Sequence, residues 1–314
     1  HNKTFNSLGA EAKIWYEENG ELSATIAAEI KMNVSAYGII SENMIHGESR
    51  RSEEFAEIKI VTYYTLKKGA RALEVRTEID NVAMDHRMRV VFDTGINTKI
   101  AESAGHFYID KRSTIPEENT YYPEMQTLPK GYFTTLRDQE CGFSFVDQST
   151  CEYEADQQGR LSITLFRGVR NIICTEFRSA GSFPHENGGQ SLGKLNFSYI
   201  LYPFTKNQTT MIAERMSAPI KTVQTTKGHG TEPDCISHLE VPEDLVVTAI
   251  KKAENSDKIV IRMYNPLDKT VTGAIHSSYK NAHLINLNEE YEGNFDLDNI
   301  SIPSNKIITI EVEK

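Results

Sequence analysis

Alternation of apolar and charged side chains is the feature of this sequence that most constrains its fold. In residues 71–80, Leu73, Val75 and Ile79 are apolar, and the residues between them are mainly charged. This period of two residues indicates an antiparallel strand with one buried and one solvated face. The preceding run, residues 57–66, is rich in Ile, Val, Thr and Tyr, and a Lys-Lys-Gly-Ala turn joins the two runs. The sequence therefore predicts a β-hairpin here.

Further β-type runs fill most of the chain, whereas helical periodicity is scarce. Turn-forming residues separate these runs, as is typical of sandwiches. Residues 227–230, Lys-Gly-His-Gly, have the composition of a linker, and several shorter runs follow them. The sequence therefore predicts an all-β protein with a large domain over residues 1–230. A small sandwich of roughly immunoglobulin size is expected over residues 231–314.

Charge and cysteine content exclude several classes of function. The net charge of −10 leaves no Lys/Arg surplus to replace phosphate counterions, so we expect no nucleic-acid partner. Because no apolar run reaches the length of a membrane span, we expect no membrane partner. Four cysteines, none of them in a C-x-x-C pair, favour a reduced, cytoplasmic protein without a structural zinc site. The chain opens on His1 rather than on Met, and we expect further residues upstream of it.

The sequence lacks the motifs of a self-sufficient enzyme. It contains no G-x-S-x-G nucleophile elbow, no G-x-x-x-x-G-K phosphate loop and no H-E-x-x-H zinc helix. Alternation would place His106, Tyr108 and Asp110 on one strand face. A metal site needs three or four converging ligands, so we favour His106 as a satisfied or solvated strand residue. Loop carboxylates such as Asp156 are expected to be solvated as well. We therefore assign no catalytic residue and no metal ligand.

A more specific pattern lies at residues 81–90, Asn-Val-Ala-Met-Asp-His-Arg-Met-Arg-Val. A strand that ends in an Asn turn and is followed by Asp-His-Arg-x-Arg-Val resembles the start of the C-terminal β-region of glycoside hydrolase family 38, the α-mannosidases. Further segments resemble later parts of that region, in the same order: residues 161–167, 189–193 with 197–203, 249–254 and 261–266. The resemblance is to the bacterial type of α-mannosidase and mannosylglycerate hydrolase.

The resemblance implies a large mutarotase-like β-supersandwich followed by a small immunoglobulin-like β-sandwich. It also implies a retaining, metal-dependent enzyme that hydrolyses terminal α-mannosyl linkages. In such an enzyme this chain would support an N-terminal catalytic domain and form one wall of the substrate pocket. The nucleophile and a zinc-type divalent cation would lie in that domain, upstream of His1, so we expect no cofactor in this chain. The implied partners are an α-mannoside and the chain's own N-terminal catalytic domain, and formation of a homo-oligomer is left open.

Five residues are candidate substrate contacts. The resemblance places a substrate-facing arginine in the segment that holds Arg167, Arg170 and Arg178, and a guanidinium fork suits sugar hydroxyls as well as carboxylates. Tyr121 and Tyr122 form a second candidate edge, since aromatic rings stack on the C–H faces of sugars. For each of these residues a structural role, as a salt-bridged arginine or a packed loop tyrosine, is the favoured alternative.

Two other functions stay open on the sequence. A mutarotase-like fold can host the His/Glu acid–base pair of a sugar epimerase, for which His86 and His106 are the candidates. A carbohydrate-binding module would need an exposed aromatic platform, and Trp15 is the only Trp in the chain. The sequence does not distinguish an oligosaccharide from mannosylglycerate as the substrate.

Overall fold

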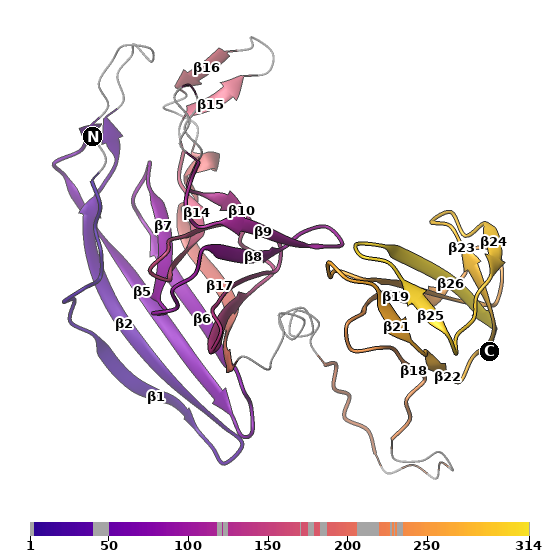
Figure 1. Ribbon diagram of the computed structural model, residues 1–314. Helices are drawn as coiled ribbons and strands as arrows, with labels where there is room; N and C mark the ends of the chain where they lie inside the picture. Colours follow the sequence, from indigo (N-terminus) through magenta and orange to yellow (C-terminus); the bar gives the residue numbers. More distant parts are fainter. Residues whose placement is uncertain are drawn as a thin grey trace. The chain divides into compact units, whose positions relative to one another are not determined.

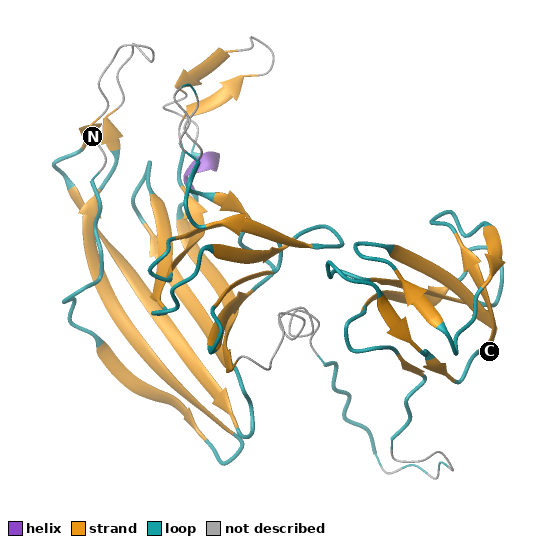
Figure 2. Ribbon diagram, viewed as in Figure 1, coloured by secondary structure: helices purple, strands orange, loops and turns teal. Residues whose placement is uncertain are grey.

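The computed structural model is all-β in the part of the chain that it describes, as the strands of Figure 2 show. The described residues are 3–39, 50–117, 121, 125–169, 171–174, 179–182, 187–205, 220–226, 228, 230 and 235–313. The one helical element within them is a 3-10 turn, η1 (Gly188–Gln190). None of the described residues form a helix that could cross a membrane. The predicted all-β fold class, a large sandwich followed by a small one, is confirmed.

Two compact units make up the chain. The first comprises His1–Ala101 with Arg112–Gln208, and the second comprises Glu102–Lys111 with Thr209–Lys314. Each unit has a hydrophobic core of its own. The predicted boundary near Gly230 stays a prediction.

The largest sheet has nine strands in the order β1-β2-β5-β6-β17-β12-β11-β8-β9. Figure 1 labels β1, β2, β5, β6 and β17 within it. These strands are β1 (Lys13–Asn19), β2 (Ser23–Ser35), β5 (Phe55–Lys67), β6 (Leu73–Asn81), β17 (Gly193–Thr205), β12 (Cys141–Val146), β11 (Phe133–Arg137), β8 (Ile100–Ala104) and β9 (Ile109–Ser113). The predicted hairpin is confirmed, because β5 and β6 pair antiparallel with Tyr64 opposite Val75. As the alternation predicts, Val75 and Ile79 are buried, whereas Glu74 and Arg76 are exposed.

A four-stranded sheet of order β10-β13-β14-β7 packs on one face of the large sheet, which we call the inner face. Its strands are β10 (Leu128–Pro129), β13 (Glu152–Ala155), β14 (Arg160–Arg167) and β7 (Arg87–Asp93). The core between the sheets joins Val75, Phe145 and Tyr199 of the large sheet to Leu161 and Ile163 of β14. Burial of these apolar side chains is the main favourable term for this unit.

Two short strand pairs extend the first unit beyond its sandwich. They are β3 (Gly38–Ile39) with β4 (Arg50–Arg51), and β15 (Asn171–Cys174) with β16 (Ser179–Ser182). β15 follows β14 along the chain. The candidate site lies where these two pairs join the rest of the first unit, near Gly38, Arg51 and Gly168.

The second unit contains a five-stranded sheet and two strand pairs, β18–β22 and β21–β25. The sheet has the order β19-β20-β26-β23-β24. The bounds are β18 (Leu239–Glu240), β19 (Val246–Lys252), β20 (Ile259–Tyr264), β21 (Val271–Gly273), β22 (His276–Ser277), β23 (Lys280–Ile285), β24 (Tyr291–Asn294), β25 (Ile300–Ile302) and β26 (Ile307–Glu313). Ile261, Met263, Ile302 and Ile310 are fully buried in its core.

One prediction about local structure is wrong. His106 and Tyr108 do not lie on a strand, because residues 106–108 form the bend between β8 and β9. Phe107 has φ 71°, in the left-handed region, and such a residue turns the chain instead of extending it. The strand β9 begins only at Ile109, and His106 is exposed, as expected for a solvated histidine.

Candidate functional site

Asp85 lies in the loop between β6 and β7 and is the centre of a hydrogen-bonded cluster that we call the Asp85 node. Its Oδ2 accepts a hydrogen bond from the backbone N of Gly38 (3.0 Å), and its Oδ1 accepts one from Nε2 of Gln190 (2.8 Å). Its own backbone N donates to Oε1 of Gln190 (2.8 Å). Asp85 has φ 56°, and aspartate tolerates this left-handed conformation better than most residues. The node therefore joins the β6–β7 loop to β3 and to η1.

Arg51 of β4 attaches a further segment to the node. Its Nη1 donates to the carbonyl oxygen of Asp85 (2.5 Å), and its Nη2 donates to those of Ser35 (2.7 Å) and Met84 (3.2 Å). Burial lowers the pKa of Arg51, and the Asp85 carboxylate opposes this shift. A guanidinium with such a high intrinsic pKa stays charged, so these are charge-assisted hydrogen bonds.

The exit of β14 is fixed by the same node. The backbone N of Gly168 donates to the carbonyl oxygen of His86 (2.7 Å), and that of Val169 donates to the carbonyl oxygen of Gly189 (2.8 Å). Gly168 approaches Gln190 so closely that a Cβ atom would lie 3.0 Å from both its backbone oxygen and Oε1. The chain that leaves Arg167 toward β15 therefore starts from a rigid base.

His86 packs inside this region instead of facing solvent. Its ring meets the ring of Phe166 edge-on, with 5.3 Å between centroids. Neither ring nitrogen is exposed to solvent. Burial and the charge of Arg51 lower the pKa of His86, so the imidazole is neutral. An enclosed imidazole of this kind gives no support to the epimerase alternative.

Arg167 lies at the end of β14. Its side chain is on the face of the four-stranded sheet that points away from the large sheet, which we call the outer face. Its Nη2 and Nε both lie 2.9 Å from Oε2 of Glu152 on β13, and its side chain is 42% exposed. On the same face Arg89 pairs with Glu154 at 2.8 Å. Arg167 thus combines an ion pair with access to solvent, directly before the segment that the node holds.

Of the other four candidate residues, the structure describes only Tyr121. Tyr121 is 87% exposed. Arg170, Arg178 and Tyr122 lie outside the described residues, so their roles stay predictions.

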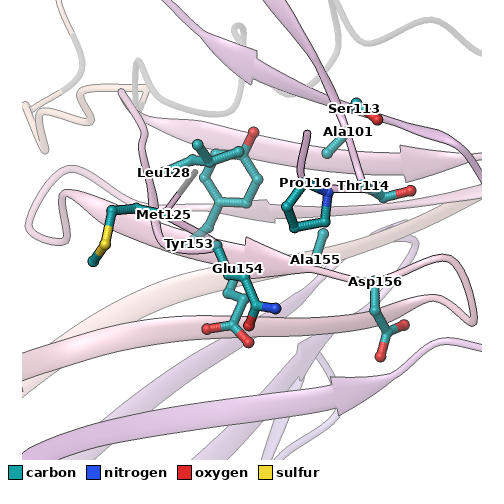
Figure 3. A pocket seen from close by; sticks show the side chains of 11 residues that line it. Ala101, Ser113, Thr114, Pro116, Met125, Leu128, Tyr153, Glu154, Ala155 and Asp156 are labelled. Atoms are coloured by element: carbon teal, nitrogen blue, oxygen red, sulfur yellow. The ribbon is translucent and has the colours of Figure 1, made fainter. Parts of the chain in front are cut away.

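A cavity of about 250 Å³ lies in the first unit, beside β13 (Figure 3). Its lining combines apolar, hydroxyl, amide and carboxylate groups: Ala101, Ser113, Thr114, Pro116, Met125, Gln126, Leu128, Tyr153, Glu154, Ala155 and Asp156. Both carboxylates already have partners, since Glu154 pairs with Arg89 and Oδ1 of Asp156 accepts from the backbone N of Gln158 and Arg160. The cavity is smaller than most small-molecule sites and holds no free charged group that would orient a ligand.

No group of three or more His, Cys, Asp or Glu side chains within the described ranges could hold a metal ion. The position of the divalent cation that the resemblance implies stays a prediction. Sequence reasoning also missed Arg51, because nothing in the sequence links it to Asp85, 34 residues away.

Comparison with known proteins agrees with the resemblance along the chain. Residues 2–171 match the model of the glycosyl hydrolases family 38 C-terminal domain, and residues 244–313 match that of the family 38 C-terminal beta sandwich domain. A Halalkalibacterium halodurans protein named "Putative mannosylglycerate hydrolase" is 26% identical over 282 residues. The match covers 83% of this chain and 30% of that protein.

Two solved structures share the fold. The crystal structure of an alpha-mannosidase from Enterococcus faecalis V583 matches with a TM-score of 0.85 and 21% identity, over 97% of this chain and 35% of that one. A family 38 glycosyl hydrolase from Enterococcus faecalis matches with a TM-score of 0.82 and 21% identity, over 97% and 37%. The chain thus spans about a third of the length of these relatives. Because one family model alone covers more than half of its residues, the chain belongs to glycoside hydrolase family 38, of which it comprises the C-terminal domains.

Proposed function

We propose that the chain is the non-catalytic C-terminal part of a retaining, metal-dependent α-mannosidase. It supports an N-terminal catalytic domain and forms one wall of the pocket for a terminal α-mannosyl residue. The observation that carries this function is the match to both C-terminal family domains in a chain about a third as long as its relatives. The name of the Halalkalibacterium relative favours mannosylglycerate or a similar small α-mannoside as the substrate.

The division of labour follows from the chemistry of retaining glycosidases. Such an enzyme needs a carboxylate nucleophile and a carboxylic acid/base on either side of the scissile bond. The cavity carboxylates Glu154 and Asp156 are held by neighbours, and the described residues offer no cation site. The nucleophile, the acid/base and a zinc-type cation are therefore assigned to the N-terminal domain. The role left to this chain is to bind and orient the sugar.

The Asp85 node supports this positioning role. It fixes the backbone directly after β14, where the N–H groups of Gly168 and Val169 donate to the carbonyl oxygens of His86 and Gly189. A binding residue placed on a rigid base loses less conformational entropy when it engages a ligand. Arg167 stands directly before this base, with its guanidinium held by Glu152 and still partly exposed. We assign it the hydrogen bonds to substrate hydroxyls.

Activity of two lengths of protein tests the division of labour. The protein that also carries the N-terminal domain is expected to hydrolyse an aryl α-mannoside with retention of configuration and to lose activity in a chelator. The 314-residue chain alone is expected to show no turnover. Metal-dependent turnover by the short chain would contradict the assignment. Tight mannose binding by the short chain, with no hydrolysis by the long protein, would favour a carbohydrate-binding module.

Substitution of Arg167 tests the pocket wall. In the long protein Arg167→Ala should lower kcat/KM about tenfold or more, which corresponds to the loss of one charge-assisted contact in the transition state. The matched control is Arg160→Ala at the other end of β14, whose guanidinium pairs with Asp93 at 2.9 Å on the same face. Equal kinetics of the two variants would reduce Arg167 to an ion-paired surface residue.

A further inference from the structure

One row of side chains across the large sheet is exposed at one end and buried at the other. Cross-strand pairing aligns Tyr16 of β1, Ile26 of β2, Tyr64 of β5, Val75 of β6 and Tyr199 of β17. Directly paired residues point to the same face of a sheet, so all five lie on the inner face. Their exposed fractions are 68%, 41%, 39%, 3% and 6% in that order. The four-stranded sheet therefore covers only the β6–β17 end of the row.

The neighbouring rows are uncovered in the same place. Ile14 pairs with Ala28, and Ala24 pairs with Leu66, so Ile14 and Leu66 also face inward, with exposed fractions of 66% and 53%. We call Ile14, Tyr16, Ile26, Tyr64 and Leu66 the open end of the inner face. In Figure 1 the four-stranded sheet lies toward the upper part of this unit, and the lower ends of β1, β2 and β5 extend beyond it.

On the other face of β2 and β5, charged side chains lie farther along the strands. There Lys31 pairs with Glu57 at 2.8 Å, and Lys59 pairs with Glu29 at 2.7 Å. These ion-paired side chains are suited to contact with water, whereas none of the five residues of the open end is charged. Contiguous exposed apolar side chains mark an interaction surface, and tyrosine is enriched in such surfaces.

The length of the relatives indicates what covers this surface. The chain matches only 30% to 37% of the relatives, so the larger part of such a protein lies outside the matched C-terminal domains. Interfaces between domains of one chain bury on the order of 1,000 Å². We infer that the open end of the inner face is the docking surface for the N-terminal portion of the longer protein, which meets it with apolar side chains. This inference rests on the proposed function, because that function supplies the N-terminal portion.

Hydroxyl-radical footprinting of the long protein, read by mass spectrometry, tests the docking surface. Tyr16 and Tyr64 should be oxidised slowly, at a rate within about twofold of that of the buried Tyr199, and unfolding in urea should restore the rate expected for an accessible tyrosine. Oxidation of folded Tyr16 more than about fivefold faster than that of Tyr199 would overturn the inference. Protection that disappears on dilution of the long protein would also overturn it, because a second copy would then be the occupant.

A substitution provides an independent readout. Ile26→Ser in the long protein should lower its melting temperature by several degrees more than Val91→Ser does. Val91 is the matched control, since it is also β-branched, lies in the middle of β7 and is 48% exposed on the outer face. Equal shifts for the two variants would overturn the inference. The activity of the unsubstituted long protein toward an aryl α-mannoside distinguishes failure of the proposed function from failure of the docking surface. An inactive protein contradicts the proposed function, whereas an active protein with a rapidly oxidised Tyr16 contradicts only the docking surface.

Discussion

The two ends of β2 and β5 differ in how their side chains are covered. At one end lies the Asp85 node, where Arg51, Asp85 and Gln190 satisfy one another and the nearby carbonyl groups. At the other end the same strands present apolar side chains such as Ile26 and Tyr64 to solvent. The polar groups of the node therefore find their partners within this chain, whereas the apolar side chains of the open end are buried only when another surface covers them. Each prediction below tests one side of this contrast.

The largest effect is expected at the node. Arg51→Ala removes three charge-assisted hydrogen bonds to buried or half-buried carbonyl oxygens, those of Ser35, Met84 and Asp85. We expect the free energy of unfolding to fall by about 3 to 4 kcal/mol, as when polar groups are left without partners. Urea denaturation measures the change, and Arg50→Ala, an exposed neighbour, is the control and should change it by less than about 0.5 kcal/mol. Equal values for the two variants would show that the node contributes nothing of its own.

The free energy of unfolding should depend on pH in the alkaline range, because of Tyr199 at the buried end of the row. Burial raises the pKa of Tyr199 to about 12, although its hydrogen bond with Thr77 opposes the shift. In the unfolded chain the hydroxyl of Tyr199 loses its proton near pH 10, whereas in the folded chain it keeps it up to about pH 12. Tyr199 therefore does not change the free energy of unfolding below pH 10, and it lowers this free energy as the pH rises from 10 to 12. The loss should approach about 2.7 kcal/mol, since each unit of pKa difference is worth about 1.4 kcal/mol. Tyr199→Phe should flatten the stability curve between pH 10 and 12, and parallel curves for parent and variant would contradict the assignment.

Two truncations compare the covered and open parts of one row directly. In the short chain Val75→Ala should lower the free energy of unfolding by about 2 kcal/mol, because it empties space in the core. Ile26→Ala removes more carbon atoms, yet it should cost less than about 1 kcal/mol, because its side chain already meets water. A cost for Ile26→Ala equal to that for Val75→Ala would mean that something within the chain covers the open end.

Much of the fold could be predicted from local pattern, because alternation reports directly which face of a strand is buried. The hairpin of β5 and β6 and the all-β class follow from it. Alternation does not report how far a covering sheet extends, so the exposure of Tyr16 and Ile26 could not be predicted. It also misled at His106, where a left-handed Phe107 turns the chain within a pattern that reads as a strand.

The candidate site was predictable only in part. The Asp-His-Arg segment at residues 85–87 stood out as a motif, and the Gln190 turn resembled a later family segment, but their contact across 105 residues is a property of the fold. Arg51 belongs to no motif. Arg167 could be selected as a candidate from the resemblance, whereas its partner Glu152 on the adjacent strand depends on the register of β13 and β14.

The smallest effect tests how tightly the node holds the exit of β14. A Cβ atom at Gly168 would lie 3.0 Å from two oxygen atoms of Gln190 and 3.4 Å from the backbone N of Asp85, so these groups must shift by a few tenths of an ångström. Gly168→Ala should therefore lower the free energy of unfolding by about 1 kcal/mol, as mild overpacking does. Gly188→Ala is the matched control, because no described atom lies within 4 Å of its Cβ position. If Gly168→Ala is instead as stable as Gly188→Ala in urea denaturation, Gln190 can give way freely, and the node is then too loose to act as a rigid base for the segment after Arg167.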